Sequence, residues 1–207
     1  NLTIGRTADY SGWREIFDGF IDEAPLSNTA RPAAWIKAEY NNQNNATQGG
    51  FFSDVGASTR GIAGGNVSIN GVGAVVMDEI TASGTLGVTT TGAVTDTGTL
   101  TITGATTIAA GAGNNITLDT TTNDFTSIGI TTGNNVSITD EDDLILNAST
   151  VSGTLGVTTA GAITDGGVLT VTGATTIAAG AGNSITLDDV HNFSSVGITT
   201  GNNVTLN

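Results

Sequence analysis

Closely spaced carboxylates are the first feature of this sequence that suggests chemistry. Asp140, Glu141, Asp142 and Asp143 are consecutive and lie between two aliphatic stretches. Carboxylates two residues apart on a turn can converge on a hard cation, and calcium takes oxygen ligands. Asp140, Asp142 and Asp143 are therefore candidate calcium ligands. The segment lacks the spaced glycines and the terminal Glu of known calcium loops, which favours the alternative of a solvated acidic turn.

Two further groups of titratable residues invite a catalytic interpretation. Asp22 and Glu23 are adjacent, but neighbouring residues of a strand point to opposite faces of the sheet. We therefore expect one hydrogen-bonded and one solvated carboxylate rather than an acid–base couple. His191 is the only histidine, and the corresponding part of an earlier copy of the same repeat contains Asn123. A histidine without a repeated partner is not expected to be a catalytic base.

The distribution of charge argues against an enzyme that acts on acidic polysaccharides. Polysaccharide lyases and hydrolases with β-helix folds need Asp, Arg, Lys or His side chains from neighbouring coils to project onto one groove. The last basic residue is Arg60, so residues 61–207 contain no Lys or Arg. A lyase would have no cation there to stabilise a uronate. We predict that the chain is not an enzyme.

The charge and composition also exclude several partners. The 207 residues carry a formal net charge of −14, and residues 61–207 contain twelve acidic residues. Such a surface repels phosphate, so we predict no nucleic-acid partner and no binding to anionic membrane surfaces. The sequence has no run of 18 apolar residues, so no membrane insertion is expected. Because cysteine is absent, disulfides and thiolate metal sites are excluded.

A long internal repeat dominates the second part of the chain. Residues 83–90 return without a change as residues 152–159, and residues 103–114 return as residues 172–183, both at an offset of 69. Towards the end of the second copy, by residue 192, the offset has fallen to 68, because the second copy is shorter by one residue. Repeats of this kind are supersecondary units that bury their apolar faces by stacking on their neighbours.

Short alternating stretches within each unit predict half-buried strands. Ile116-Thr-Leu118 and Val136-Ser-Ile138 alternate aliphatic and hydroxyl side chains, and glycine–asparagine segments between such stretches suit tight corners. A unit with this period divides into three coils of about 23 residues. We therefore predict an all-β fold, a parallel β-solenoid over residues 61–207, with residues 80–147 and 148–207 as near copies.

The interior of this solenoid is predicted from the same alternation. It should contain the following residues, together with their counterparts one unit later: Leu86, Val88, Val94, Leu100, Ile102, Ile108, Ile116, Leu118, Phe125, Ile128, Ile130, Val136, Ile138 and Leu146.

The first part of the chain differs from the repeats in composition. All Trp and Tyr residues lie within the first forty positions. Pro32 suits a first helical turn, and Ala33, Ile36 and Tyr40 recur at helical spacing, which predicts one short helix. Residues 44–60 are expected to form a linker and an irregular first coil. Residues 1–6 are typical of the interior of a module, so we expect the chain to be a segment of a longer protein.

Two segments of this first part carry a resemblance to a known family. Phe17-Asp-Gly-Phe-Ile-Asp-Glu23 and Trp35-Ile-Lys-Ala-Glu-Tyr40 resemble the closing strands and terminal helix of a laminin-G/concanavalin-A-like jelly roll, in the variants found in large bacterial surface proteins. The resemblance covers about residues 2–43. It implies that residues 1–43 are the C-terminal part of such a module, whose relatives bind carbohydrate or act as spacers.

The repeats carry a second resemblance. The segments at residues 116–119, 123–125, 144–155 and 161–165 are similar to the filamentous-haemagglutinin-like repeats of bacterial adhesins and related β-strand-repeat exoproteins. The resemblance covers about residues 60–207. It implies a right-handed parallel β-helix, export to the cell surface or the extracellular space, and a role in cell adhesion or fibre building.

Two functions follow from these observations. The first is a non-enzymatic structural segment of an extracellular adhesin or surface fibre, with a β-solenoid shaft that polymerises end to end with copies of itself or with other fibre proteins. The alternative is a carbohydrate-binding surface module, carried on the solenoid as a stalk and directed at cell-surface or matrix glycans. Calcium is the single cofactor that the sequence suggests, at Asp140, Asp142 and Asp143.

Overall fold

The computed structural model describes residues 6–8, 14–16, 52–53 and 61–207. The chain forms two compact units, residues 1–37 and 38–207. In the first unit, β1 (Arg6–Ala8) pairs antiparallel with β2 (Arg14–Ile16). The predicted helix at residues 33–40 lies outside the described residues, as do Asp22, Glu23 and most of residues 44–60.

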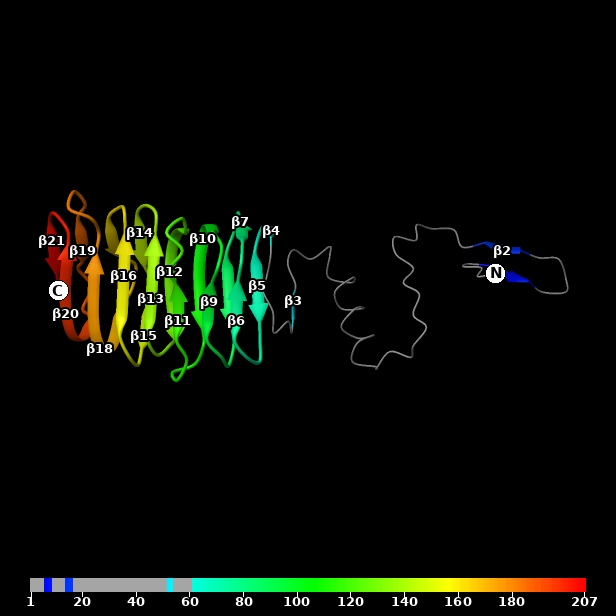
Figure 1. The fold of residues 1–207 in the computed structure, drawn as a ribbon, viewed down its shortest axis with the longest axis horizontal. Coiled ribbons are helices and arrows are strands. Elements are labelled where there is room, and N and C mark those ends of the chain that lie inside the picture. Colours follow the sequence, from blue (N-terminus) through cyan, green and yellow to red (C-terminus); the bar gives the residue numbers. More distant parts are fainter. Residues whose placement is uncertain (1–5, 9–13, 17–51, 54–60) are drawn as a thin grey trace. The chain divides into compact units, whose positions relative to one another are not determined.

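The second unit is a parallel β-solenoid of about seven turns (Figure 1), as the repeat and the strand pattern predicted. Strands on successive turns are hydrogen-bonded in parallel. The length of a turn is not constant: Ile62 pairs with Ile80, whereas Thr101 pairs with the more distant Asp124. Within the described residues no helix is present. The right-handed sense implied by the resemblance stays a prediction.

Each turn contains three strand segments, and the segments of successive turns stack into rows of paired strands. Row 1 consists of β4 (Ile62–Gly64), β7 (Ile80–Ala82) and the first halves of β10 (Leu100–Ala109) and β12 (Asp124–Thr132). Row 2 consists of β3 (Phe52–Ser53), β5 (Val67–Asn70), β8 (Leu86–Thr89), the second halves of β10 and β12, β14 (Leu144–Leu146), β17 (Ile163–Asp165), β19 (Ile185–Leu187) and β21 (Val204–Leu206).

The remaining segments form two further rows. Row 3 consists of β6 (Val75–Met77), β9 (Val94–Asp96), β11 (Ile116–Leu118), β13 (Val136–Asp140), β16 (Leu155–Thr159), and the second halves of β18 (Leu169–Ala178) and β20 (Asn192–Thr200). Row 4 consists of β15 (Ser149–Val151) and the first halves of β18 and β20. It begins beside the end of β12, where Gly133 bridges to Val151. The earlier turns therefore use rows 1 to 3, and the later turns use rows 2 to 4.

Long strands span two rows because the chain passes a corner without leaving the sheet. In β10 the register shifts between Ile102 and Ala105, so its first half pairs with β7 and its second half with β8. The corner contains Gly104, where a Cβ atom would lie 2.5 Å from the carbonyl oxygen of Gly84 on the previous turn. Glycine is therefore needed for the close stacking of turns at this corner.

The repeat does not correspond to a whole number of turns. When the halves of β10 and β12 are counted separately, β13 is the tenth segment after β5, its equivalent in the first copy. Ten segments at three per turn make three and one third turns. The second copy thus starts one segment further round the turn: β8 lies in row 2, whereas its copy β16 lies in row 3. The prediction of three turns of about 23 residues was wrong in this respect.

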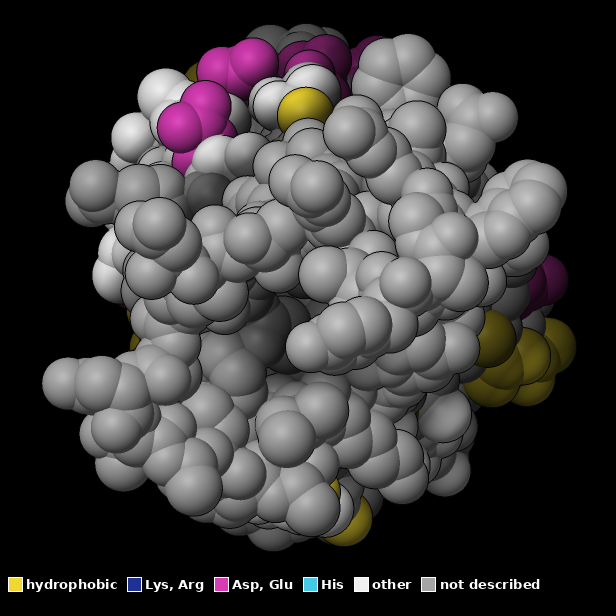
Figure 2. Space-filling view, turned by 90° about the vertical axis from the view of Figure 1, so that its right-hand side faces the viewer, with side chains coloured by type: hydrophobic (Ala, Val, Ile, Leu, Met, Phe, Trp, Pro, Cys, Tyr) yellow, Lys and Arg dark blue, Asp and Glu magenta, His cyan; other side chains and the backbone are white. Residues whose placement is uncertain are grey.

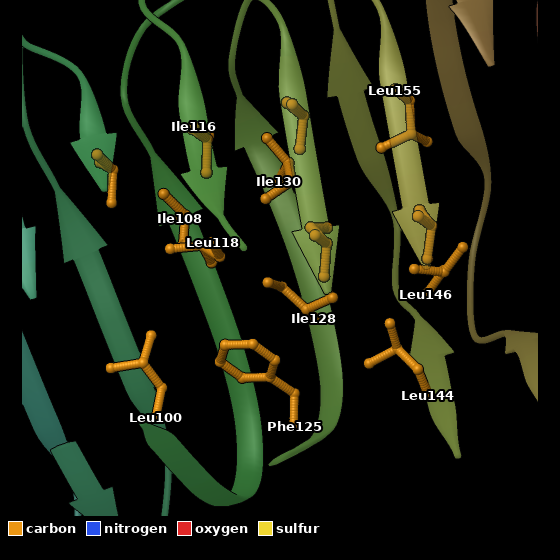
Figure 3. Close-up of a cluster of buried hydrophobic side chains, with 14 of the residues drawn as sticks. Leu100, Ile108, Ile116, Leu118, Phe125, Ile128, Ile130, Leu144, Leu146 and Leu155 are labelled. Carbon is orange, nitrogen blue, oxygen red and sulfur yellow. The ribbon is translucent and has the colours of Figure 1, made fainter. Parts of the chain in front are cut away.

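The core fills the space that the rows enclose (Figure 3). Alternate residues of each segment point inward, and all fourteen interior residues predicted for the first copy are buried. Each such side chain stabilises the fold by about 1.5–3 kcal/mol. Near the last turn, however, Phe193 and Ile198 are partly buried, and Val204 and Leu206 are 44% and 46% exposed. Their equivalents in the first copy are covered by β14 to β16, and no described strand covers β20 and β21 in that way.

Candidate functional site

Acidic side chains are concentrated along one corner of the solenoid. Nine of the twelve acidic residues after Arg60 lie where the chain leaves one of the first four strands of row 3 (β6, β9, β11 and β13) for the next segment. We call this set the acidic corner: Asp78, Glu79, Asp96, Asp119, Asp124, Asp140, Glu141, Asp142 and Asp143. Figure 2 shows Asp and Glu side chains gathered mainly at the upper edge of that view. The other three, Asp165, Asp188 and Asp189, lie where the chain passes from row 2 into row 4, because the second copy starts one segment further round.

Asp140 is the buried member of the predicted calcium site. It is 2% exposed, and its Oδ1 accepts a hydrogen bond of 2.7 Å from the backbone N–H of Phe125 on the previous turn. Its Oδ2 accepts a longer one, 3.3 Å, from the N–H of Asp142. Burial raises the pKa of Asp140 to about 7, and the carboxylates of Asp142 and Asp124 raise it further. The hydrogen bonds from the N–H groups of Phe125 and Asp142 act in the opposite direction. This carboxyl group therefore holds two turns together, rather than facing solvent as the sequence suggested.

The other two predicted ligands are placed differently. Burial and the neighbouring carboxylates of Asp124 and Asp143 raise the pKa of Asp142. Asp143 accepts a hydrogen bond of 2.6 Å at Oδ1 from the N–H of Ala162 on the next turn. Across residues 61–207, no group of three or more His, Cys, Asp or Glu side chains is arranged to hold a metal ion. Calcium binding at Asp140, Asp142 and Asp143 therefore stays a prediction that rests on the sequence alone.

A second hydrogen-bonded group on the acidic corner was not predicted. Asp96 is 7% exposed and accepts hydrogen bonds from the backbone N–H groups of Asp119 (3.0 Å) and Thr120 (3.3 Å) and from Nδ2 of Asn123 (2.6 Å). The fully buried Asn123 in turn accepts a 2.9 Å bond at Oδ1 from the N–H of Leu100. The group fixes the loop between β11 and β12 against the turn before it.

The second copy contains a counterpart of this group with a different side chain. Asp165 accepts hydrogen bonds from the N–H groups of Asp188 (3.4 Å) and Asp189 (2.8 Å). His191 stands in the place of Asn123: its Nε2 lies 2.9 Å from Oδ2 of Asp165, and its Nδ1 accepts a 3.1 Å bond from the N–H of Leu169. The sequence held a signal for this match, because the one-residue slip between the copies aligns His191 with Asn123.

The histidine–aspartate pair is built as a structural group. The His191 side chain is 1% exposed and that of Asp165 is 3% exposed. A general base needs a ring nitrogen within reach of a substrate proton, but both nitrogens of His191 face groups of the protein itself.

In the part of the chain that the structure describes, no helix is long and apolar enough to cross a membrane.

A family model described as repeats of unknown function (DUF5649) matches the chain twice, at residues 64–132 and 133–200. Each match covers one unit of ten strand segments, and the boundary between them falls between β12 and β13. The period agrees with that of the near copies predicted at residues 80–147 and 148–207, although the starting point differs. No significant match was found among the curated proteins or the solved structures.

Proposed function

The chain belongs to the family of repeats of unknown function DUF5649, and from the way its two repeats stack we propose that it is a non-enzymatic shaft. In this proposal the shaft is a structural segment of an extracellular bacterial adhesin or surface fibre. The observation that carries the proposal is the junction between the repeats, because a shaft requires that units join as firmly as they are built.

The junction supports coaxial stacking of one repeat on the next. Ile116 in the first repeat pairs with Val136 in the second, and Ile128 pairs with Leu146, so hydrogen bonding continues across the boundary. All four side chains are buried, with exposures of 0%, 3%, 1% and 3%. Each further repeat would add three and one third turns, which is about 16 Å at 4.8 Å per turn.

The outer surface suits a shaft that is exposed to solvent. Outward-facing threonines lie in register on neighbouring turns, where Thr81 pairs with Thr101 and Thr164 pairs with Thr186. No Lys or Arg follows Arg60, so parallel shafts repel one another through their acidic residues. A strand edge such as that of β21 can pair with a further strand. We propose that a further repeat, in the same chain or in another copy, supplies the strand that pairs with this edge.

The proposal is tested with tandem arrays of two, four and six repeats, examined by electron microscopy and small-angle scattering. The expected result is a rod that lengthens by about 16 Å per repeat and returns to the same orientation after every third repeat. Arrays that collapse, or whose length does not increase with the number of repeats, would contradict the shaft. Surface labelling of intact cells that carry the protein tests the extracellular location.

The alternative function is a carbohydrate-binding module in residues 1–43, with the solenoid as its stalk. It is supported by the jelly-roll resemblance and by the antiparallel pair β1–β2, which differs from the parallel strands of the solenoid. The full chain and a chain that begins at residue 61 are compared on a glycan array. Binding by the full chain alone would favour this alternative, and no binding by either would reject it.

A further inference from the structure

The two repeats build the same hydrogen-bonded corner with one difference. In the first repeat, Asn123 Oδ1 accepts the Leu100 N–H at 2.9 Å while its Nδ2 donates to Asp96. In the second, His191 Nδ1 accepts the Leu169 N–H at 3.1 Å while its Nε2 lies 2.9 Å from Asp165. The connecting loop is one residue shorter in the second repeat, and the longer imidazole side chain spans the same two partners.

The two side chains match in chemistry only while the histidine is neutral. An amide presents one acceptor and one donor group, and it does not titrate. A neutral imidazole with its proton on Nε2 presents the same pattern, whereas a protonated imidazole has two donors and no acceptor. Because Nε2 faces the carboxylate of Asp165, the second proton must go to Nδ1. That atom is the acceptor for the Leu169 N–H.

The surroundings offer no replacement for the hydrogen bond between the Leu169 N–H and His191 Nδ1 when a proton occupies Nδ1. Leu169 is 1% exposed, so its N–H cannot donate to solvent water when the acceptor is lost. The centroid of the Phe193 ring lies 5.2 Å from that of the His191 ring. The charged groups nearby are Asp165, at the end of β17, and Asp188 and Asp189, in the loop before the histidine; no Lys or Arg is present after Arg60.

The carboxylate partner of His191 is held in its charged form. Although burial opposes it, the N–H groups of Asp189 and Asp188, together with His191, hold the pKa of Asp165 below its ordinary value. Histidine is the side chain whose charge changes between pH 5 and 8. Protonated His191 can therefore keep its contact with Asp165, where Nε2 makes no well-aligned hydrogen bond, but it cannot keep the bond from Leu169.

We propose that His191 is a proton-sensitive latch that closes the start of β18 against the loop before β20 when neutral and releases it when protonated. Release frees the Leu169 N–H and loosens the adjacent pairing of Thr170 with Asn192 and of Val171 with Phe193. The first repeat has no such response, because Asn123 cannot take up a proton. Acid therefore opens one corner of the second repeat and leaves the equivalent corner of the first repeat closed.

The experiment is amide hydrogen exchange of the full chain by NMR at pH 7.5 and pH 5.0, with each rate divided by its intrinsic rate. The protection of Leu169 is expected to fall on the order of tenfold between the two conditions, as for the loss of one buried hydrogen bond. The protection of Leu100, the matched amide in the same molecule, is expected to stay constant. Equal behaviour of the two amides would overturn the latch.

A variant separates the histidine from other acid effects. His191→Gln keeps the reach, the acceptor and the donor but removes the titration. Leu169 protection in this variant should be independent of pH, and a fall that persists would show that another group causes it. Nitrogen-15 shifts of the imidazole provide an independent measurement: a neutral ring with its proton on Nδ1 would also overturn the proposal.

Discussion

The two repeats offer a comparison of one sequence in two settings. Residues 103–114 and 172–183 are identical, yet β10 lies in rows 1 and 2 and β18 in rows 4 and 3. Both strands bury the same alternate residues and bend at the same glycine. The local sequence therefore determines strand, corner and inward face. The row in which a strand lies depends on the number of segments that precede it.

The differences between the repeats arise from neighbours and from one changed residue. Phe125 is fully buried, whereas its counterpart Phe193 is partly buried, because β14 and β15 cover β12. Asn123 and His191 fill equivalent places, and of the two side chains only the imidazole can take up a proton. Comparing matched variants in the two repeats therefore separates what a residue does from where it lies.

The largest contrast is expected for the two phenylalanines. Phe125→Ala should lower the free energy of unfolding by about 3–5 kcal/mol, because the ring is fully enclosed and a cavity remains. Phe193→Ala should cost clearly less, because its ring is only partly covered. Urea denaturation followed by circular dichroism measures both. Equal losses would show that the two settings are energetically the same, and the comparison would break.

The corner glycines should behave alike in both repeats. A Cβ atom on Gly104 or Gly173 would lie 2.5 Å from the carbonyl oxygen of the glycine one turn earlier. Gly104→Ala and Gly173→Ala should therefore each cost about 1–3 kcal/mol through overpacking. Gly87→Ala is the control, because nothing lies within 4 Å of its added Cβ. Unequal losses from the two corner variants would show that the row in which a strand lies affects the corner.

Much of this arrangement followed from the sequence, and the missing part has a physical reason. Alternation predicted the strands and the inward residues, such as Ile116 and Leu118, because burial selects one face of each segment. The period of the repeat did not predict the number of turns, because successive turns differ in length. Without that number, the stacking of Asp78, Asp96 and Asp140 on one corner was not foreseen.

The unknown number of turns also explains why the environment of Asp140 was not predicted. The sequence showed four consecutive acidic residues and suggested either a calcium loop or a solvated turn. The structure places Asp140 against the backbone N–H of Phe125, and that contact depends on which turn lies beside it. The pairing of His191 with Asp165 was missed for a similar reason, since it joins residues one turn apart.

The carboxyl groups of Asp140 and Asp165 should respond to pH with opposite signs. The pKa of Asp140 is raised to about 7 from 3.8, so the folded state binds more protons and stability falls as pH rises between these values. Asp140→Asn should remove this loss. The difference in the free energy of unfolding between the variant and the native chain should be larger at pH 8 than at pH 4, in favour of the variant, by roughly 1–2 kcal/mol. This figure allows for solvent screening at the exposed neighbours.

Asp165 provides the opposite case. Its pKa is lowered, so it contributes stability above its ordinary value of 3.8 that is lost as pH falls through the lowered one. Asp165→Asn should therefore destabilise the protein at pH 7 and lose that effect in acid. Thermal unfolding between pH 3 and pH 8 measures both variants. A loss of stability on Asp140→Asn at pH 8 would contradict the conclusion that burial disfavours the charged form of Asp140.

The smallest expected effect concerns two threonines inside the core. Thr106 and Thr175 are equivalent, are 0% and 1% exposed, and have no hydrogen-bond partner for Oγ1 within the described part of the chain. A buried hydroxyl without a partner is costly, and valine has the same shape without it. Thr106→Val and Thr175→Val should each stabilise the protein by about 1 kcal/mol. Thr107→Val, at the exposed neighbouring position, is the control. Because Thr106 lies in row 2 and Thr175 in row 3, equal gains would extend the equivalence of the two repeats from the corners to the core. A gain in one repeat alone would show that the parts of the core beneath the two rows differ in polarity.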